Sequence, residues 1–320
     1  MQVKELSEKE YGKYSALVSE YGSIFNSLEW LSLFDGTKLF GIYDNGDKLI
    51  GGFHLCFEKR AGMNFIRNAP YTPFIGLVLK NDSKNKSNYQ SFEKRVFTQL
   101  ADFFEQLPWQ VISASFHFSH IDMQPFIWKK FKVIPNYTYL IGLSESADVL
   151  KSMMASERRN DIAKAVKDGV EVRQEEDLKV VRELILNTFN RKQKSVNKSY
   201  IDKILFDFAE SKNSFAFVSY KENIPLAASF CLHDKHNAYY LLGGYDSLQK
   251  HHGAGACAVW EAIQHAQKLG LKHFDMEGSM IKNVESYFRG FGGKLTPYFT
   301  VNKATVPFEI VLKFIKREMF

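Results

Sequence analysis

The sequence contains few cysteines and no long apolar run. Its only cysteines, Cys56, Cys231 and Cys257, are widely separated and include no CxxC pair. This spacing excludes a disulfide framework and favours a reducing compartment. The first residues, MQVKELSEKEY, lack the apolar segment of a signal peptide, and no run reaches the about 18 apolar residues of a membrane span. We therefore expect a cytoplasmic protein.

The sequence also lacks low-complexity segments and a strong charge of either sign. The formal net charge of +6 favours anionic partners in general but is too small to indicate binding to nucleic acid, and we expect no DNA partner. Hydrophobic residues make up 45% of the 320 positions, with 28 Phe and 15 Tyr. This composition is typical of a globular protein with a large core.

The chain divides near Ser144–Lys151 into two halves with the same order of predicted elements. Apolar runs bounded by Asn, Pro, Asp and Gly predict the strands, and helical spacing of apolar residues predicts the helices. In the first half, strands are predicted at 38–43, 49–57, 74–79, 111–116 and 137–143, with helices at 91–107 and 125–131. In the second half, strands are predicted at 215–220, 226–233, 238–243, 271–276 and 297–301, with helices at 255–269 and 284–291.

This repeated order predicts an α/β fold of two tandem domains, each a mixed β-sheet flanked by helices. The predicted domains are 1–145 and 146–320. Residue identity between the halves is weak. The first half has KNDSKNKSNYQS where the second has a glycine-containing loop. We therefore expect a degenerate first domain that shapes the acceptor pocket.

The segment KHHGAG, Lys250–Gly255, lies between a predicted strand and a predicted helix. The first amides of a helix have no intrahelical partner, so they bind phosphate readily, and glycines allow a close approach. Lys250, His251 and His252 would add positive charge, while Gly253, Ala254 and Gly255 would offer backbone N–H groups. The simpler alternative is a connection in which the glycines only permit the turn.

The same segment resembles the acyl-CoA loop of the GNAT acyltransferase superfamily, which reads Gln/Arg-x-x-Gly-x-Gly/Ala. This chain has the spacing but places Lys250 first. Ser156–Val172 (SERRNDIAKAVKDGVEV), Val284–Tyr298 (VESYFRGFGGKLTPY) and Pro125–Leu143 (PFIWKKFKVIPNYTYLIGL) resemble segments of the FemABX-type transferases and their acetyltransferase relatives. The resemblance implies transfer of an activated acyl group to an amine, with acyl-CoA, acetyl-CoA above all, as co-substrate.

Such a transfer needs a proton acceptor and stabilisation of the tetrahedral oxyanion. Arg289 occupies the family's cationic position and is the candidate for the oxyanion; its alternative is an ordinary surface arginine. Asp275 and Glu277 end a predicted strand, where alternation would place both on one face. When two carboxylates lie close together, the pKa of one of them rises, which suits proton abstraction near neutral pH. Asp275 and Glu277 are therefore both candidates for the base. Tyr245 and Tyr287 could protonate the leaving group, although packing would also explain them.

Arg158 and Arg159, at a predicted helix start, are candidates for substrate binding. Together with the basic run Arg191–Lys198, they could face a phosphorylated substrate or a tRNA; the simpler reading of the run is a solvated loop. His233 with His236, and His117 with His120, lack further ligands at zinc-like spacing, so we expect no metal. The amphipathic tail 307–320 predicts docking onto the protein itself, with peripheral membrane contact as the alternative.

Three functions remain open on the sequence. The first is transfer from acyl-CoA to an amino group of a small or lipid-linked acceptor, such as a cell-envelope glycan precursor. The second is FemABX-type aminoacyl transfer from aminoacyl-tRNA to a peptidoglycan precursor. The third is a non-catalytic binding module that keeps only the fold.

Overall fold

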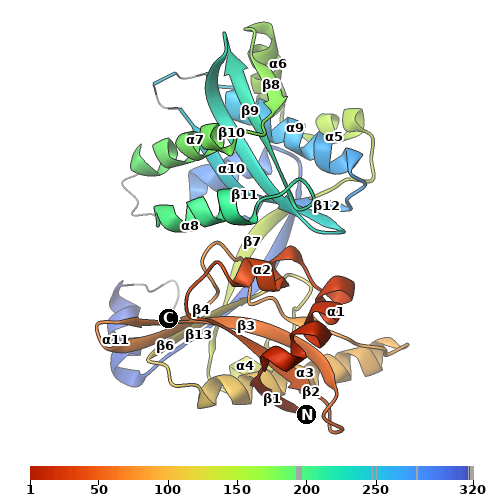
Figure 1. Cartoon of the computed structure of the whole chain (residues 1–320), viewed down its shortest axis with the longest axis vertical. Helices are drawn as coiled ribbons and strands as arrows, with labels where there is room; N and C mark the ends of the chain where they lie inside the picture. Colours follow the sequence, from red (N-terminus) through yellow and green to blue (C-terminus); the bar gives the residue numbers. More distant parts are fainter. Residues whose placement is uncertain (192–196, 247, 250, 279, 316, 318–320) are drawn as a thin grey trace. The chain divides into compact units, whose positions relative to one another are not determined.

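The computed structural model describes the whole chain except residues 192–196, 247, 250, 279, 316 and 318–320 (Figure 1). The described residues form two compact units. Unit 1 comprises 1–136 and 297–320, and unit 2 comprises 137–296. Within the described ranges, no helix is both long and apolar enough to cross a bilayer.

Unit 1 contains a mixed sheet with strand order β1-β2-β3-β4-β6-β13, and the short strand β5 also pairs with β3. Its core is rich in phenylalanines from the strands and from the long helix α3, including Phe53, Phe97, Phe104 and Phe116. The strands are β1 (Gln2–Glu5), β2 (Thr37–Tyr43), β3 (Leu49–Arg60), β4 (Met63–Arg67), β5 (Val78–Leu79) and β6 (Val111–Phe116). The helices are α1 (Tyr11–Tyr21), α2 (Leu28–Leu31), α3 (Lys86–Gln106), α4 (Gln124–Trp128) and α11 (Val306–Ile315).

Unit 2 has strand order β7-β12-β11-β10-β9-β8. The two-residue β9–β10 turn has positive φ at Glu222 (51°) and Asn223 (63°), as tight hairpins require. The strands are β7 (Lys132–Gly142), β8 (Glu171–Gln174), β9 (Ser214–Lys221), β10 (Ile224–His233), β11 (Asn237–Tyr245) and β12 (His273–Asp275). The helices are α5 (Ala147–Met153), α6 (Ser156–Lys167), α7 (Leu178–Arg191), α8 (Lys198–Asp202), α9 (Ala254–Lys268) and α10 (Lys282–Arg289). A π-helical turn, Lys203–Phe208, follows α8.

The units differ from the predicted division at 145/146, because the last strand of each half pairs with the other half. β7 leaves the first half and pairs antiparallel with β12, through Ile141 and Phe274. β13 (Lys294–Ala304) follows α10 and pairs antiparallel with β6, through Val301 and Ala114. Residues 297–320, predicted to belong to the second domain, therefore belong to unit 1.

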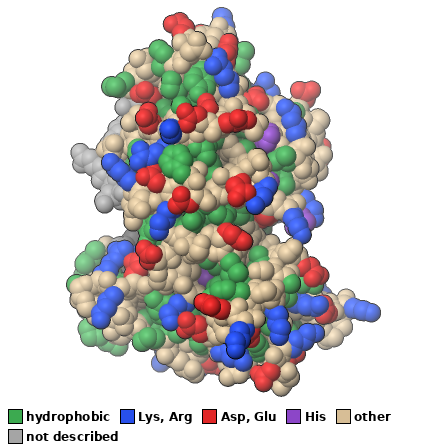
Figure 2. Space-filling view, viewed as in Figure 1, with side chains coloured by type: hydrophobic (Ala, Val, Ile, Leu, Met, Phe, Trp, Pro, Cys, Tyr) green, Lys and Arg blue, Asp and Glu red, His purple; other side chains and the backbone are tan. Residues whose placement is uncertain are grey.

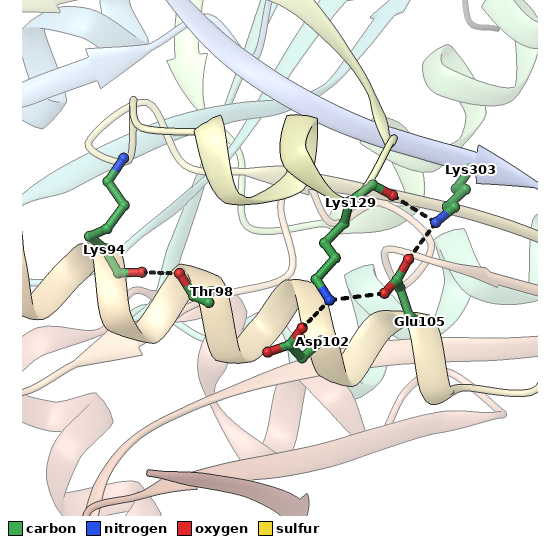
Figure 3. A network of polar contacts seen from close by, with 6 residues as sticks. All are labelled: Lys94, Thr98, Asp102, Glu105, Lys129 and Lys303. Carbon is green, nitrogen blue, oxygen red and sulfur yellow. Dashed lines mark hydrogen bonds and ion pairs between the residues drawn. The ribbon is translucent and has the colours of Figure 1, made fainter.

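Lys303 of β13 is bound within unit 1 by polar contacts to α3 and to Lys129, the residue that follows α4 (Figure 3). Its ammonium lies 2.7 Å from the Glu105 carboxylate of α3 and donates to the Lys129 carbonyl, also at 2.7 Å. Lys129 in turn contacts Asp102 at 2.6 Å and Glu105 at 3.3 Å. These contacts attach the late strand β13 to elements that lie far earlier in the sequence.

Candidate functional site

The parallel strands β11 and β12 pair only along a short stretch and then diverge. Their pairing covers Asn237–Tyr239 against His273–Asp275. Beyond it, β11 continues to Tyr245 while paired with β10 on its other side, after a bulge near Leu241. Past the end of β12, the edge of β11 therefore has no parallel partner among the described residues. In α/β sheets, ligands bind where neighbouring parallel strands part at their carboxyl ends.

In unit 1 the equivalent divergence is filled by the chain itself. The parallel strands β4 and β6 pair from Phe65 to Arg67 only. Where β4 ends, Ile75 takes its place, donating its N–H to the Ser115 carbonyl and accepting from the His54 N–H, both at 2.9 Å. Unit 2 is therefore the better candidate for a ligand site.

Helix α9 is the helix that follows β11 in the chain, and some of its first N–H groups are already bonded. The Gly253 N–H donates to the His251 ring at 3.2 Å, and the Ala254 N–H donates to the His251 carbonyl at 3.2 Å. The N–H groups of Gly255 and Ala256 have no hydrogen-bond acceptor among the described residues. These two amides remain available to an anion.

The two glycines of the loop have different surroundings. A Cβ on Gly253 would lie 2.1 Å from the carbonyl oxygen of Asp161 and 2.9 Å from the Cβ of Ala165, both on α6. Gly253 therefore permits close packing of α6 against α9, which the sequence reasoning did not foresee. A Cβ on Gly255 would meet only the Tyr287 hydroxyl, at 3.3 Å. Gly255 is the glycine that leaves space next to free amides.

The histidines of the loop are paired with carboxylates. His251 Nε2 lies 3.1 Å from Asp168, and this hydrogen bond lowers the pKa of the Asp168 carboxyl. His252 Nε2 lies 3.0 Å from Asp161. Lys250 lies outside the described residues. The histidines were predicted to add positive charge for binding a phosphate. The carboxylates of Asp161 and Asp168 partly neutralise that charge.

Arg158 is buried beside the same loop, with only 7% of its surface exposed. Its guanidinium lies 2.8 Å from Asp161 and stacks over the Tyr287 ring at 4.6 Å, while its Nε has no partner among the described residues. Burial raises the pKa of the Tyr287 hydroxyl, which therefore stays protonated at neutral pH. Arg158, Tyr287 and Gly255 thus form one cluster at the start of α9.

The carboxylates Asp275 and Glu277 lie together at the end of β12. Asp275 is 5% exposed and accepts hydrogen bonds from the Thr138 hydroxyl and, at 2.9 Å, from the Glu277 N–H. Burial raises the pKa of Asp275 to about 6, although both hydrogen bonds oppose the shift. Burial and the neighbouring Asp275 charge raise the pKa of Glu277 well above its usual value, and its Oε1 has no described partner. Both shifts favour the protonated forms, so each carboxylate of the pair is a stronger base than a free one.

The two carboxylates meet by a different route from the one predicted. The sequence reasoning relied on strand alternation, but β12 ends at Asp275. Glu277 adopts a left-handed φ of 57°, which is uncommon for a non-glycine residue. This turn, and not the pleat of a strand, places the two carboxylates together.

Arg289 and Arg159 lie apart from these clusters. The Arg289 side chain is 63% exposed and pairs with Glu285 of the same helix at 3.0 Å. Glu285 also accepts from the Tyr139 hydroxyl on β7. The Arg159 guanidinium donates to the Ser152 carbonyl at 2.8 Å. Tyr245 is half-buried and donates its backbone N–H to the Thr188 hydroxyl at 2.8 Å.

Two residues that contact the candidate site were missed on the sequence. Asp161 pairs with both Arg158 and His252, and Thr138 holds Asp275. The i,i+3 spacing of Arg158 and Asp161 on a helix could have signalled that pair. Nothing local to Thr138 indicates its partner.

Of the predicted basic run Arg191–Lys198, residues 192–196 lie outside the described residues. Among the described residues no cluster of three metal-ligating side chains is present.

Residues 152–289 match the family model described as an acetyltransferase (GNAT) domain. This segment belongs to the GNAT family. The match covers β8 to β12, α9 and α10 and thus both clusters of the site. It indicates acyl transfer as the class of reaction, as the sequence resemblance predicted. No curated protein sequence matches the chain.

Solved structures share the fold over nearly the whole chain. The structure of FemX matches with a TM-score of 0.68 at 13% identity, covering 98% of this chain and all (100%) of that one. L-PGS from Bacillus licheniformis matches with a TM-score of 0.59 at 12% identity, covering 99% and 98%. A tandem GNAT protein from the clavulanic acid biosynthesis pathway matches with a TM-score of 0.53 at 9% identity, covering 94% and 98%. The predicted fold of two GNAT-like structures in tandem is confirmed.

Proposed function

We propose that the GNAT domain transfers an acyl group from acyl-CoA to an amino group of a small or lipid-linked acceptor. The observation that carries this proposal is the pair of free amides, Gly255 and Ala256, at the start of α9, the helix that follows β11. These amides would bind a phosphate of the donor and fix its acyl end near the diverging strands. Acetyl-CoA is the smallest such donor.

The reaction forms an amide bond and breaks a thioester. The acceptor nitrogen attacks the thioester carbonyl, the C–S bond breaks, and the amine loses a proton as the thiolate leaves. The Asp275–Glu277 pair, in which burial raises both pKa values, would accept that proton. The Tyr287 hydroxyl, next to Gly255, would donate a proton to the thiolate and regain one from solvent before the next turnover.

Other predicted residues take lesser places in this proposal. Arg158 holds the Tyr287 ring from one face and supplies positive charge beside the free amides. Arg289 remains a candidate for the oxyanion only if the donor draws it away from Glu285. Tyr245 stays a second candidate for the proton donor, and Arg159 a candidate for substrate contact.

Calorimetric titration with acetyl-CoA and longer acyl-CoAs tests the donor. The wild type should bind, and Gly255→Val should weaken binding at least tenfold because its side chain would cover the free amides. Gly142→Ala is a matched control, because nothing lies within 4 Å of the added Cβ on this strand of unit 2. A wild type that binds no acyl-CoA at millimolar concentration would exclude CoA as donor.

Aminoacyl transfer from tRNA is the second candidate. It is supported by the contacts that the loop already makes. Helix α6 packs against Gly253, and the N–H groups of Gly253 and Ala254, which CoA would use, already donate to His251. Incubation with charged tRNA and a lipid-linked amine acceptor tests it. Absence of transfer, together with absence of salt-sensitive tRNA retention, would exclude this candidate.

A further inference from the structure

Helix α11 of unit 1 packs on the protein with only part of its surface. Phe308 and Leu312 pack against a small cluster formed by Val111 of β6 and Ala304 of β13. Phe308 and Leu312 lie one turn apart, so they form a narrow stripe along the helix. The remaining apolar residues of α11 do not belong to this contact.

A broad apolar face of α11 is exposed. The exposed fractions are 71% for Val306, 55% for Ile310, 51% for Val311, 86% for Phe314 and 70% for Ile315. At about 100° per residue, these positions cover roughly half of the helix circumference, beside the packed stripe. Contiguous exposed apolar surface of this kind on a soluble domain marks an interaction site.

The surroundings of this face are basic. The β3–β4 hairpin packs through Phe65 against the same Val111–Ala304 cluster as α11, and it carries Lys59, Arg60 and Arg67. Lys313 and Arg317 lie on α11 or directly after it and are exposed. The carboxylates on these elements are Glu58, which pairs with Arg60 and Arg67, and Glu309, which pairs with Lys313. Basic side chains thus outnumber acidic ones. Figure 2 shows hydrophobic and basic side chains interspersed over this part of unit 1.

We propose that α11 and the β3–β4 hairpin dock on an anionic lipid surface. An apolar face on a convex helix is poorly suited to a groove-binding small molecule but inserts readily between acyl chains, with Phe314 deepest. Lys and Arg beside it would contact lipid phosphates, as in amphipathic helices that lie in the membrane interface. This binding is independent of the acyl-transfer site and requires no spanning helix.

Vesicle flotation of the full chain tests the proposal. The wild type should float with vesicles of phosphatidylcholine containing about one third phosphatidylglycerol, and much less with pure phosphatidylcholine. The double variant Ile310→Ser/Phe314→Ser should lose at least tenfold in partitioning. Ile121→Ser is the matched control, because this unit 1 residue is also exposed (69%) and lies outside the face. Because all three side chains are exposed, the variants should fold, which circular dichroism checks.

Charge is tested separately by Lys59→Ala and Arg317→Ala, each expected to reduce partitioning into the anionic vesicles about fivefold. A wild type that floats with neither kind of vesicle would overturn the proposal, as would equal flotation of the Ile310→Ser/Phe314→Ser variant. A wild type that sediments as a dimer, becomes a monomer in that variant and binds no vesicles would instead assign the face to a second copy of the chain.

Discussion

Replacement of Gly253 by alanine tests whether this glycine is needed for the close packing of α6 against α9. The added Cβ would lie 2.1 Å from the Asp161 carbonyl oxygen, more than an ångström short of ordinary contact, and 2.9 Å from Ala165. The obstructing atom is backbone of α6, which cannot rotate away, so α6 or α9 must shift. Overpacking of this kind costs about 1–3 kcal/mol. For a unit of this size, the expected fall in Tm is roughly 2–12 °C.

Thermal unfolding followed by tryptophan fluorescence measures this change, because Trp260 on α9 is buried and reports on unit 2. Gly255→Ala is the control. Its Cβ meets only a hydroxyl at 3.3 Å, so the helix should be unchanged or stabilised by up to about 1 kcal/mol. If Gly253→Ala unfolds at the wild-type temperature, or both variants lose stability equally, the packing role assigned to Gly253 is wrong.

Three further predictions concern the carboxylate pair and β13. The acyl-transfer rate should fall as the pH decreases through about 6, because Asp275 then becomes protonated; a rate independent of pH between 5 and 8 would contradict its role. The Thr138 hydroxyl lowers the pKa of Asp275 in the wild type, so Thr138→Val should raise the pH at which the rate falls by about 1 unit. Thr138→Ser should restore the wild-type value. Lys303→Met should destabilise unit 1 by about 1 kcal/mol in urea unfolding, since it loses Glu105 and the Lys129 carbonyl; an unchanged midpoint would contradict this.

Local patterns predicted the second half well. The strands β9, β10 and β11 and the helix α9 lie within a few residues of their predicted ranges, because apolar periodicity and turn residues are local signals. In the first half the predicted strand at 74–79 is wrong except for Val78–Leu79, and β4 was missed. The run 74–79 is apolar because Ile75 fills the gap between β3 and β6, which resembles a strand in sequence.

The site was predictable only as far as its chemistry is local. The loop, the carboxylates and Tyr287 were proposed from residue type and order, and they stay candidates. The packing of Gly253 on α6 and the pairing of His252 with Asp161 were not, because both depend on contacts across about ninety residues. The exchange of β7 and β13 between the halves was missed for the same reason.

That exchange sets the order in which the molecule can be completed. Ser115 of β6 hydrogen-bonds to Thr300 of β13, a residue 185 positions later in the chain. During synthesis, the sheet of unit 1 therefore cannot add its final strand until all of unit 2 has left the ribosome. Contacts so distant in sequence slow folding, and the waiting edge of β6 is a surface that chaperones would need to protect.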